Sequence, residues 1–119
     1  MAIPSRILAA GNSPLATVSI AGDGATGLVS TGSTAADALQ LSAVFNTFTT
    51  GSAGGAKLPP TEVGAVVGIR NDSGNTITVY PFSTASGINA AAASVTLATG
   101  KTMILFATSA TSWASITGA

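Results

Sequence analysis

The sequence contains no cysteine and no histidine, and only 7% of its residues are charged. Without these two residue types there is no disulfide, no thiol nucleophile, no Ser–His–Asp triad and no Cys/His metal site. The four acidic residues are scattered along the chain, which argues against a paired-carboxylate site and against a calcium loop. We therefore expect a protein that is not an enzyme and that binds no cofactor.

Positive charge is equally scarce. The four basic residues (Arg6, Lys57, Arg70 and Lys101) are dispersed, and the net charge is zero. Binding to nucleic acid or to an anionic membrane surface depends on clustered Lys and Arg, so neither partner is expected. The apolar runs are far shorter than the roughly 20 residues of a membrane span, and the first ten residues do not resemble a secretory signal. These features favour a soluble protein that is made in a cytoplasm and is not exported by the usual route.

The chain is rich in glycine, small polar residues and short alternating apolar segments. Its 119 residues suffice for one small domain. Turn signals that recur about every 8–12 residues predict an all-β fold, a single small β-sandwich or barrel of jelly-roll type with about eight short strands. Residues 1–14 are expected to form an extended N-terminal arm, and residues 15–119 the β-domain. No internal repeat of fixed period is visible, which disfavours a solenoid. The predicted strands are 15–20, 26–31, 38–49, 62–71, 75–82, 94–97, 102–108 and 113–116.

Two segments carry most of the predicted topology. Residues 62–71 and 75–82 are the clearest hairpin, because residues 71–75 between them (Asn-Asp-Ser-Gly-Asn) tolerate positive φ. Residues 38–49 allow a helix or a strand. Their period-two alternation favours one strand, with Phe45 on its core-facing side.

The few aromatic residues (one Trp, one Tyr and four Phe) are about enough to fill the core of a small β-domain. Core positions are therefore predicted for Phe45, Phe106 and Trp113. The turn at residues 71–75 is either a plain hairpin connection or an exposed recognition tip. The extended arm is suited to adding a strand to a neighbouring molecule. The candidate interaction residues are Ile3, Pro4, Arg6, Leu8, Asn71, Asp72, Asn75, Tyr80 and Trp113.

Several short motifs follow one another in an order that resembles a known class of proteins. The motifs are Lys57-Leu58-Pro59-Pro60, Arg70-Asn71-Asp72-Ser73-Gly74-Asn75, Val79-Tyr80-Pro81, Gly87-Ile88-Asn89, Leu97-Ala98-Thr99-Gly100-Lys101 and Trp113. In this order, residues 57–116 are similar to short virion proteins of tailed bacteriophages. The resemblance implies a β-rich phage structural protein, and capsid decoration (cement) is its first implied role. Such proteins are often trimers.

The expected function is to bind the major capsid protein on the outside of the head and to stabilise the contacts between capsomers. A low-charge surface suits this role, because few charges are left unpaired when it is covered. The chain is then expected to be a homo-oligomer, with a trimer favoured, on the capsid surface of a virion, after synthesis in the host bacterial cytoplasm. The alternative is a tail or head-fibre module that binds host surface glycans through Tyr80 or Trp113.

Overall fold

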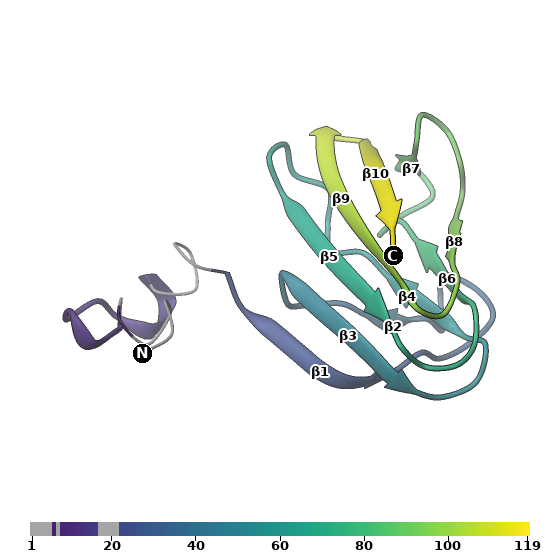
Figure 1. The fold of residues 1–119 in the computed structure, drawn as a ribbon. Coiled ribbons are helices and arrows are strands. Elements are labelled where there is room, and N and C mark those ends of the chain that lie inside the picture. The colour runs from purple at the N-terminus through teal and green to yellow at the C-terminus, as the bar shows by residue number, and fades with distance from the viewer. Residues whose placement is uncertain (1–5, 7, 17–21) are drawn as a thin grey trace.

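The computed structural model describes residues 6, 8–16 and 22–119, and strands dominate this part of the chain (Figure 1). Ten strands form two sheets there, which confirms the all-β prediction. The six-stranded sheet has the order β1 (Gly24–Val29), β3 (Phe45–Thr50), β5 (Val66–Asn71), β9 (Lys101–Ser109), β10 (Ser112–Gly118) and β7 (Gly87–Ile88). The four-stranded sheet has the order β2 (Leu39–Gln40), β4 (Gly55–Lys57), β6 (Ile77–Tyr80) and β8 (Val95–Leu97).

Between β1 and β6 the chain passes back and forth between the two sheets. β1, β3 and β5 are parallel neighbours in one sheet, and β2, β4 and β6 are parallel neighbours in the other. Each passage through both sheets is one coil, so the fold is solenoid-like. Jelly rolls are built from antiparallel strands. The predicted jelly-roll topology, and the argument against a solenoid, are therefore wrong, whereas the two packed sheets agree with the predicted sandwich.

The coils differ in length, which explains why the sequence shows no fixed repeat. In the six-stranded sheet Gly24 pairs with Phe45, and Phe45 pairs with Gly68. In the four-stranded sheet Leu39 pairs with Ala56, and Ala56 pairs with Val79. Counted in residues along the chain, the step from Leu39 to Ala56 is the shortest of the four. The steps from Phe45 to Gly68 and from Ala56 to Val79 are the longest. The loops absorb these differences, so successive strands align in space without aligning in sequence.

The second half of the chain closes the coils with antiparallel strands. β8 pairs with β6, β9 pairs with β5, and β9 and β10 form a hairpin (Figure 1). Strands were predicted at 94–97, 102–108 and 113–116, and the structure confirms all three. The predicted hairpin of residues 62–82 is wrong, because β5 and β6 belong to different sheets. The single strand predicted for residues 38–49 is also wrong, since it divides into β2 and β3, again in different sheets.

The core lies between the two sheets. Along β9 the buried side chains alternate with exposed ones, as the pleat of a strand requires. Trp113 is 1% exposed, which confirms its predicted core position. Phe45 and Phe106 are 54% and 38% exposed, so their predicted core positions are wrong. The largest fully buried side chains are Trp113, Phe48, Leu58, Ile69, Ile77, Ile88, Leu97, Met103, Leu105, Val79 and Asn71.

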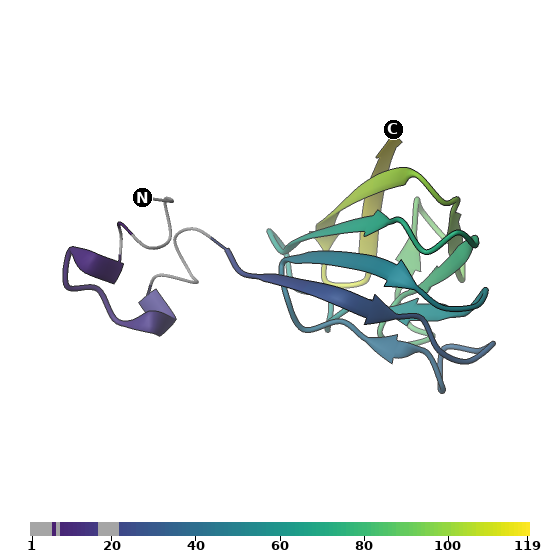
Figure 2. The same ribbon diagram turned by 60° about the horizontal axis from the view of Figure 1, so that its bottom comes forward.

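The described N-terminal residues are helical, not extended as predicted. Arg6, Leu8 and residues 14–16 have helical backbone, and the Ala10 N–H donates to the carbonyl of Arg6 at 3.1 Å. Alanine and leucine, frequent here, are strong helix formers. This segment lies apart from the sheets in both ribbon views (Figures 1 and 2). Most of the strand predicted at 15–20 lies outside the described residues. No helix in the described ranges has the length and apolar character needed to cross a membrane.

Candidate functional site

The outer face of the six-stranded sheet carries a row of apolar residues that crosses four strands. Phe45 of β3 pairs with Gly68 of β5, Gly68 pairs with Ile104 of β9, and Ile104 pairs with Ile116 of β10. Phe45, Ile104 and Ile116 are 54%, 39% and 65% exposed. Large apolar side chains that gather on a solvent-facing sheet surface mark an interaction site more often than isolated ones do.

A glycine allows the aromatic ring in this row to lie against the sheet. A Cβ atom added to Gly68 would lie 2.9 Å from Cδ1 of Phe45, closer than carbon atoms normally approach. The Phe45 ring therefore occupies the space above Gly68 that a side chain would fill. A Cβ on Gly22 would lie 3.2 Å from Cε2 of the same ring. The ring is thus held between two glycines and remains half exposed.

A second row lies two residues further along the same strands. Val66 of β5 pairs with Phe106 of β9, which pairs with Ala114 of β10. We call the exposed side chains of both rows the apolar face: Phe45, Val66, Ile104, Phe106 and Ile116. At roughly 150–200 Å² for each whole residue, their exposed fractions sum to an apolar area on the order of 400 Å².

No charged residue belongs to the apolar face, but an ion pair lies beside it. Arg70, on β5, places Nη2 2.7 Å from Oδ1 of Asp72, and its Nε donates to the same oxygen at 2.9 Å. The hydrogen bond to Asp72 raises the pKa of Arg70 above its usual value. Arg70 Nη1 also donates to the carbonyl of Gly100 at 3.0 Å. These bonds hold the guanidinium at the polar end of the strand, outside the apolar rows.

The predicted recognition tip at residues 71–75 is mostly internal. Asn71 is 0% exposed, and its amide donates to the carbonyls of Asn75 at 2.7 Å and Leu97 at 2.8 Å. The side chain of Asn71 thereby ties the end of β5 to β8 in the other sheet, so its prediction as an exposed contact residue is wrong. Asp72 and Asn75 are exposed, but both are held by internal bonds, to Arg70 and to the carbonyl of Gly51.

Of the candidate interaction residues in the N-terminal arm, two lie outside the described residues and two are exposed. Ile3 and Pro4 fall in the part of the chain that is not described. Arg6 and Leu8 are exposed, Leu8 by 46%.

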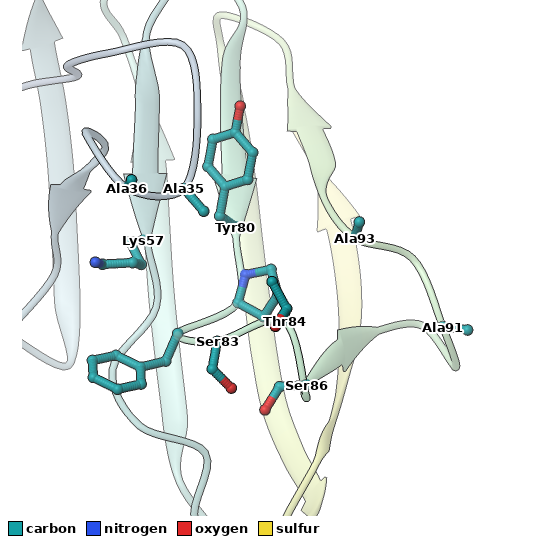
Figure 3. Close-up of a pocket in the computed structure, with 11 residues that line it drawn as sticks. Ala35, Ala36, Lys57, Tyr80, Ser83, Thr84, Ser86, Ala91 and Ala93 are labelled. Atoms are coloured by element: carbon teal, nitrogen blue, oxygen red, sulfur yellow. The ribbon is translucent and has the colours of Figure 1, made fainter.

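The four-stranded sheet is hollowed on its outer side by a cavity of about 450 Å³ (Figure 3). Its wall combines aromatic rings, small apolar residues, hydroxyl groups and one cation. Figure 3 shows Lys57 on one side, Ala91 and Ala93 on the other, and Tyr80 between them. The lining residues are Ala35, Ala36, Lys57, Tyr80, Pro81, Phe82, Ser83, Thr84, Ser86, Ala91 and Ala93. Most of these were not candidates from the sequence, because they come from separate segments of the chain.

Tyr80 and Asp37 fix one wall of the cavity. The Tyr80 hydroxyl donates to the carbonyl of Ser33 at 3.0 Å, and a Cβ on Gly55 would lie 2.8 Å from the Tyr80 ring. Asp37 Oδ1 accepts from Thr34 N at 2.8 Å, from Thr34 Oγ1 at 2.8 Å and from Ser33 N at 3.1 Å. The bonds from Thr34, its backbone N–H first, lower the pKa of Asp37 below its usual value. They clasp the loop that carries Ala35 and Ala36.

A chain of hydrogen bonds leads from the core to the same cavity. Trp113 Nε1 donates to Thr61 Oγ1 at 3.0 Å, and Thr61 Oγ1 donates to Ser86 Oγ at 3.0 Å. Because Trp113 is buried, it cannot present its ring to a sugar, and the glycan-binding alternative that relied on Trp113 is wrong in that respect. Tyr80, its other predicted residue, does line the cavity.

The residues of the apolar face were also missed by the sequence reasoning, although one signal was present. Residues 103–106 (Met-Ile-Leu-Phe) are apolar at every position, and a strand of that composition is typically covered on both faces. Comparisons of the chain with protein families, with curated proteins and with solved structures gave no match.

Proposed function

We propose that this chain is a structural protein that docks through its apolar face, and that it decorates the outside of a phage capsid. The observation that carries the proposal is the uncharged row Phe45–Gly68–Ile104–Ile116, exposed across four strands of one sheet. The resemblance of residues 57–116 to short virion proteins of tailed bacteriophages supports the choice of partner. Four of the five residues of the apolar face lie inside that stretch.

The apolar face has the character of the centre of a protein interface. Interface centres are poor in charge and rich in aromatic and aliphatic side chains, and a standard interface covers about 800 Å² on each partner. An apolar area on the order of 400 Å² leaves room for a polar rim of similar size. Arg70, Asp72 and Thr102 supply polar groups at one edge. The proposed partner surface is a complementary apolar patch of the major capsid protein.

Self-association is part of the proposal. β1 forms one edge of the six-stranded sheet, so within the described residues one side of its backbone is open to a strand from another molecule. The N-terminal segment lies away from the sheets, with Leu8 and Leu15 46% and 78% exposed. Contacts through these two elements would join copies without covering the apolar face. A trimer is the favoured assembly.

The mechanism is mechanical. Many copies bridge neighbouring capsomers, and the summed contacts resist the pressure of the packaged DNA without touching it. Each contact binds only modestly. Burial of apolar area contributes about 25 cal/mol per Å², and the loss of translational and rotational freedom on binding offsets much of this free energy. Repetition over the shell supplies the total strength.

The test is rebinding to expanded capsids that lack this chain, from the phage that encodes it. Wild-type protein at micromolar concentration is expected to cosediment with the capsids and to raise their melting temperature. Ile104→Asp, which places a charge in the centre of the apolar face, is expected to weaken binding by about tenfold or more. Thr96→Asp is the matched control, because Thr96 is an exposed strand position on the other sheet.

Circular dichroism of both variants should match the wild type. Absence of rebinding by the wild-type protein at micromolar concentration contradicts the decoration role. Equal rebinding by Ile104→Asp contradicts the role of the apolar face. The copy number per virion is an independent check, since a shell component is present in hundreds of copies and a tail or fibre component in tens or fewer.

A further inference from the structure

We propose that the cavity on the four-stranded sheet is a binding site for a saccharide that carries a carboxylate. The cavity is separate from the apolar face, and the proposal does not depend on the decoration role. Its volume of about 450 Å³ lies within the usual range of about 300–1,000 Å³ for ligand pockets. The class of ligand follows from the charge, the hydroxyl groups and the apolar walls of the cavity.

Lys57 supplies the positive charge of the cavity wall. Lys57 Nζ lies 5.7 Å from the centroid of the Phe82 ring, and Lys57 has no acidic partner in the described ranges. Lys57 is only partly exposed. Beyond its cation–π contact with Phe82, the ammonium group is available to an anionic oxygen of a ligand. The described lining contains one cation and no glycine-rich loop, so it matches a single carboxylate better than a doubly charged phosphate.

Ser86 brings to the cavity a hydroxyl group whose proton is left for a ligand. The indole Nε1–H of Trp113 is a donor only, so Thr61 Oγ1 must accept from it. The Thr61 hydroxyl then donates to Ser86 Oγ. Ser86 Oγ is an acceptor in this chain, and its own proton has no acceptor in the described part of the molecule. The cavity therefore offers a donor at Ser86 in addition to the donors of Lys57.

The cavity wall also combines apolar rings with hydroxyl groups. Phe82 is 44% exposed and Tyr80 is partly exposed, and their rings provide flat apolar surface. The hydroxyls of Ser83 and Thr84 have no partner in the described residues. A pyranose ring has one apolar side and a rim of hydroxyls that both donate and accept. It satisfies such walls and hydroxyls together, which a purely aliphatic or a purely ionic ligand does not.

The loop on the far side of the cavity is held in a strained conformation. Asn89 and Ala90 both have positive φ, 52° and 81°, and an alanine rarely adopts such a backbone. Asn89 is kept there by two bonds to Ser115 of β10, from Nδ2 to Oγ at 2.8 Å and from Ser115 N to Oδ1 at 2.9 Å. The loop then continues into Ala91 and Ala93, so the strain fixes the shape of this wall.

The test is an amide chemical-shift titration with methyl glucuronide and, as the neutral counterpart, methyl glucoside. The glucuronide is expected to shift the amide signals of residues 83–86 and 91–93, with a dissociation constant on the order of 1 mM. Lys57→Met is expected to weaken glucuronide binding by about tenfold, since a charge-assisted hydrogen bond is lost. Lys57→Arg keeps the charge and should keep binding. Lys101→Met is the matched control, because Lys101 is an exposed lysine at the start of β9.

Ser86→Ala tests the second donor without removing a charge, and it is expected to weaken binding about fivefold. Failure of both sugars to shift these signals overturns the proposal. Equal binding of the two sugars, or equal binding by Lys57→Met, overturns the assignment of a carboxylate. Shifts confined to the apolar face overturn the location. None of these outcomes bears on capsid rebinding, which Ile104→Asp tests separately.

Discussion

The outer faces of the two sheets share one packing arrangement, an aromatic ring over a glycine, but its surroundings differ between the two sheets. On the six-stranded sheet Phe45 lies over Gly68, and on the four-stranded sheet Tyr80 lies over Gly55. In each case the glycine leaves room for an aromatic ring from the neighbouring parallel strand. Phe45 has only apolar neighbours in its row and stays half exposed, which makes a surface for docking. Tyr80 is tied by its hydroxyl to Ser33, and the loops around it enclose a cavity.

The comparison shows that an exposed aromatic residue takes its role from the chain around it. Phe45, Ile104 and Ile116 remain exposed on the six-stranded sheet, so its outer face is open to a macromolecule. The four-stranded sheet is partly covered by the loops at residues 31–37 and 82–93, so its outer side carries a cavity of about 450 Å³ in place of an open apolar surface. The shared core between the sheets provides the rigid support that both sites need.

The largest expected effect is a difference in the free energy of unfolding between substitutions on the inner and outer sides of β9. Leu105 is 0% exposed and Ile104 is 39% exposed on the same strand. Leu105→Ala is expected to lower the free energy of unfolding by about 2–5 kcal/mol. Ile104→Ala is expected to lower it by less than about 1 kcal/mol. Urea unfolding at low protein concentration measures both. Equal losses would mean that Ile104 is buried in solution, and the apolar face would then not be free.

The two glycines provide a sharper comparison of the faces. A Cβ on Gly55 would meet the Tyr80 ring at 2.8 Å, Ala38 Cβ at 3.0 Å and the Thr31 carbonyl oxygen at 3.3 Å, so little there is able to move. Gly55→Ala is expected to cost about 1–3 kcal/mol of stability by overpacking. A Cβ on Gly68 would meet only the Phe45 ring within 3.5 Å, and that ring is a side chain 54% exposed to solvent, with no backbone atom at this distance. Gly68→Ala is expected to cost less than Gly55→Ala.

The expected readouts of the two glycine variants also differ in kind. Gly68→Ala should retain the fold and weaken capsid rebinding, because it displaces Phe45 from the apolar face. Gly55→Ala should leave rebinding intact at a temperature where it is folded. Thermal melts and cosedimentation of both variants distinguish these results. A larger loss of stability for Gly68→Ala than for Gly55→Ala would contradict this prediction. It would show that the surroundings of Tyr80 adapt to an added methyl group more readily than those of Phe45 do.

The smallest expected effect is a response of the cavity wall to acid. Hydrogen bonds from Thr34 and Ser33 lower the folded-state pKa of Asp37 below its usual value of 3.8. The stabilisation of the clasped loop is therefore complete above that value and is lost as the pH falls below it through the folded-state pKa. The protection factors of the Ser33 and Thr34 amides, which correct for the intrinsic pH dependence of exchange, should fall in this range. Asp37→Asn should remove the pH dependence, and an unchanged profile in that variant would exclude Asp37 as its cause.

The hairpin of β9 and β10 was predictable because all of its information is local. Two short strand-forming segments, residues 102–108 and 113–116, with a short turn between them favour antiparallel neighbours. The parallel coils were not predictable in this way. Their paired strands are separated by a full coil of chain that includes a strand of the other sheet, and loops of unequal length remove any visible period.

Residues 71–75 show how a correct local signal leads to a wrong topology. The Asn-Asp-Ser-Gly-Asn segment does turn the chain, and Gly74 has a φ of 84° as turn chemistry predicts. Nothing in that segment states which sheet the next strand joins. The contacts that accompany the change of sheet are distant in sequence, such as the bond from the buried Asn71 amide to Leu97 across the two sheets. The cavity residues were hidden for the same reason, since Lys57, Tyr80 and Ser86 meet only after successive coils have formed.

The hydrogen-bond chain from Trp113 through Thr61 to Ser86 also gives the molecule an internal optical probe. Trp113 is the only tryptophan in the sequence, so all indole fluorescence comes from this one ring. Its Nε1–H is two hydroxyl groups away from the cavity. A ligand that engages Ser86 is expected to alter the hydrogen bond on Nε1 and with it the emission maximum. Tryptophan fluorescence then offers a way to follow occupancy of the cavity in unlabelled protein, with no reporter added.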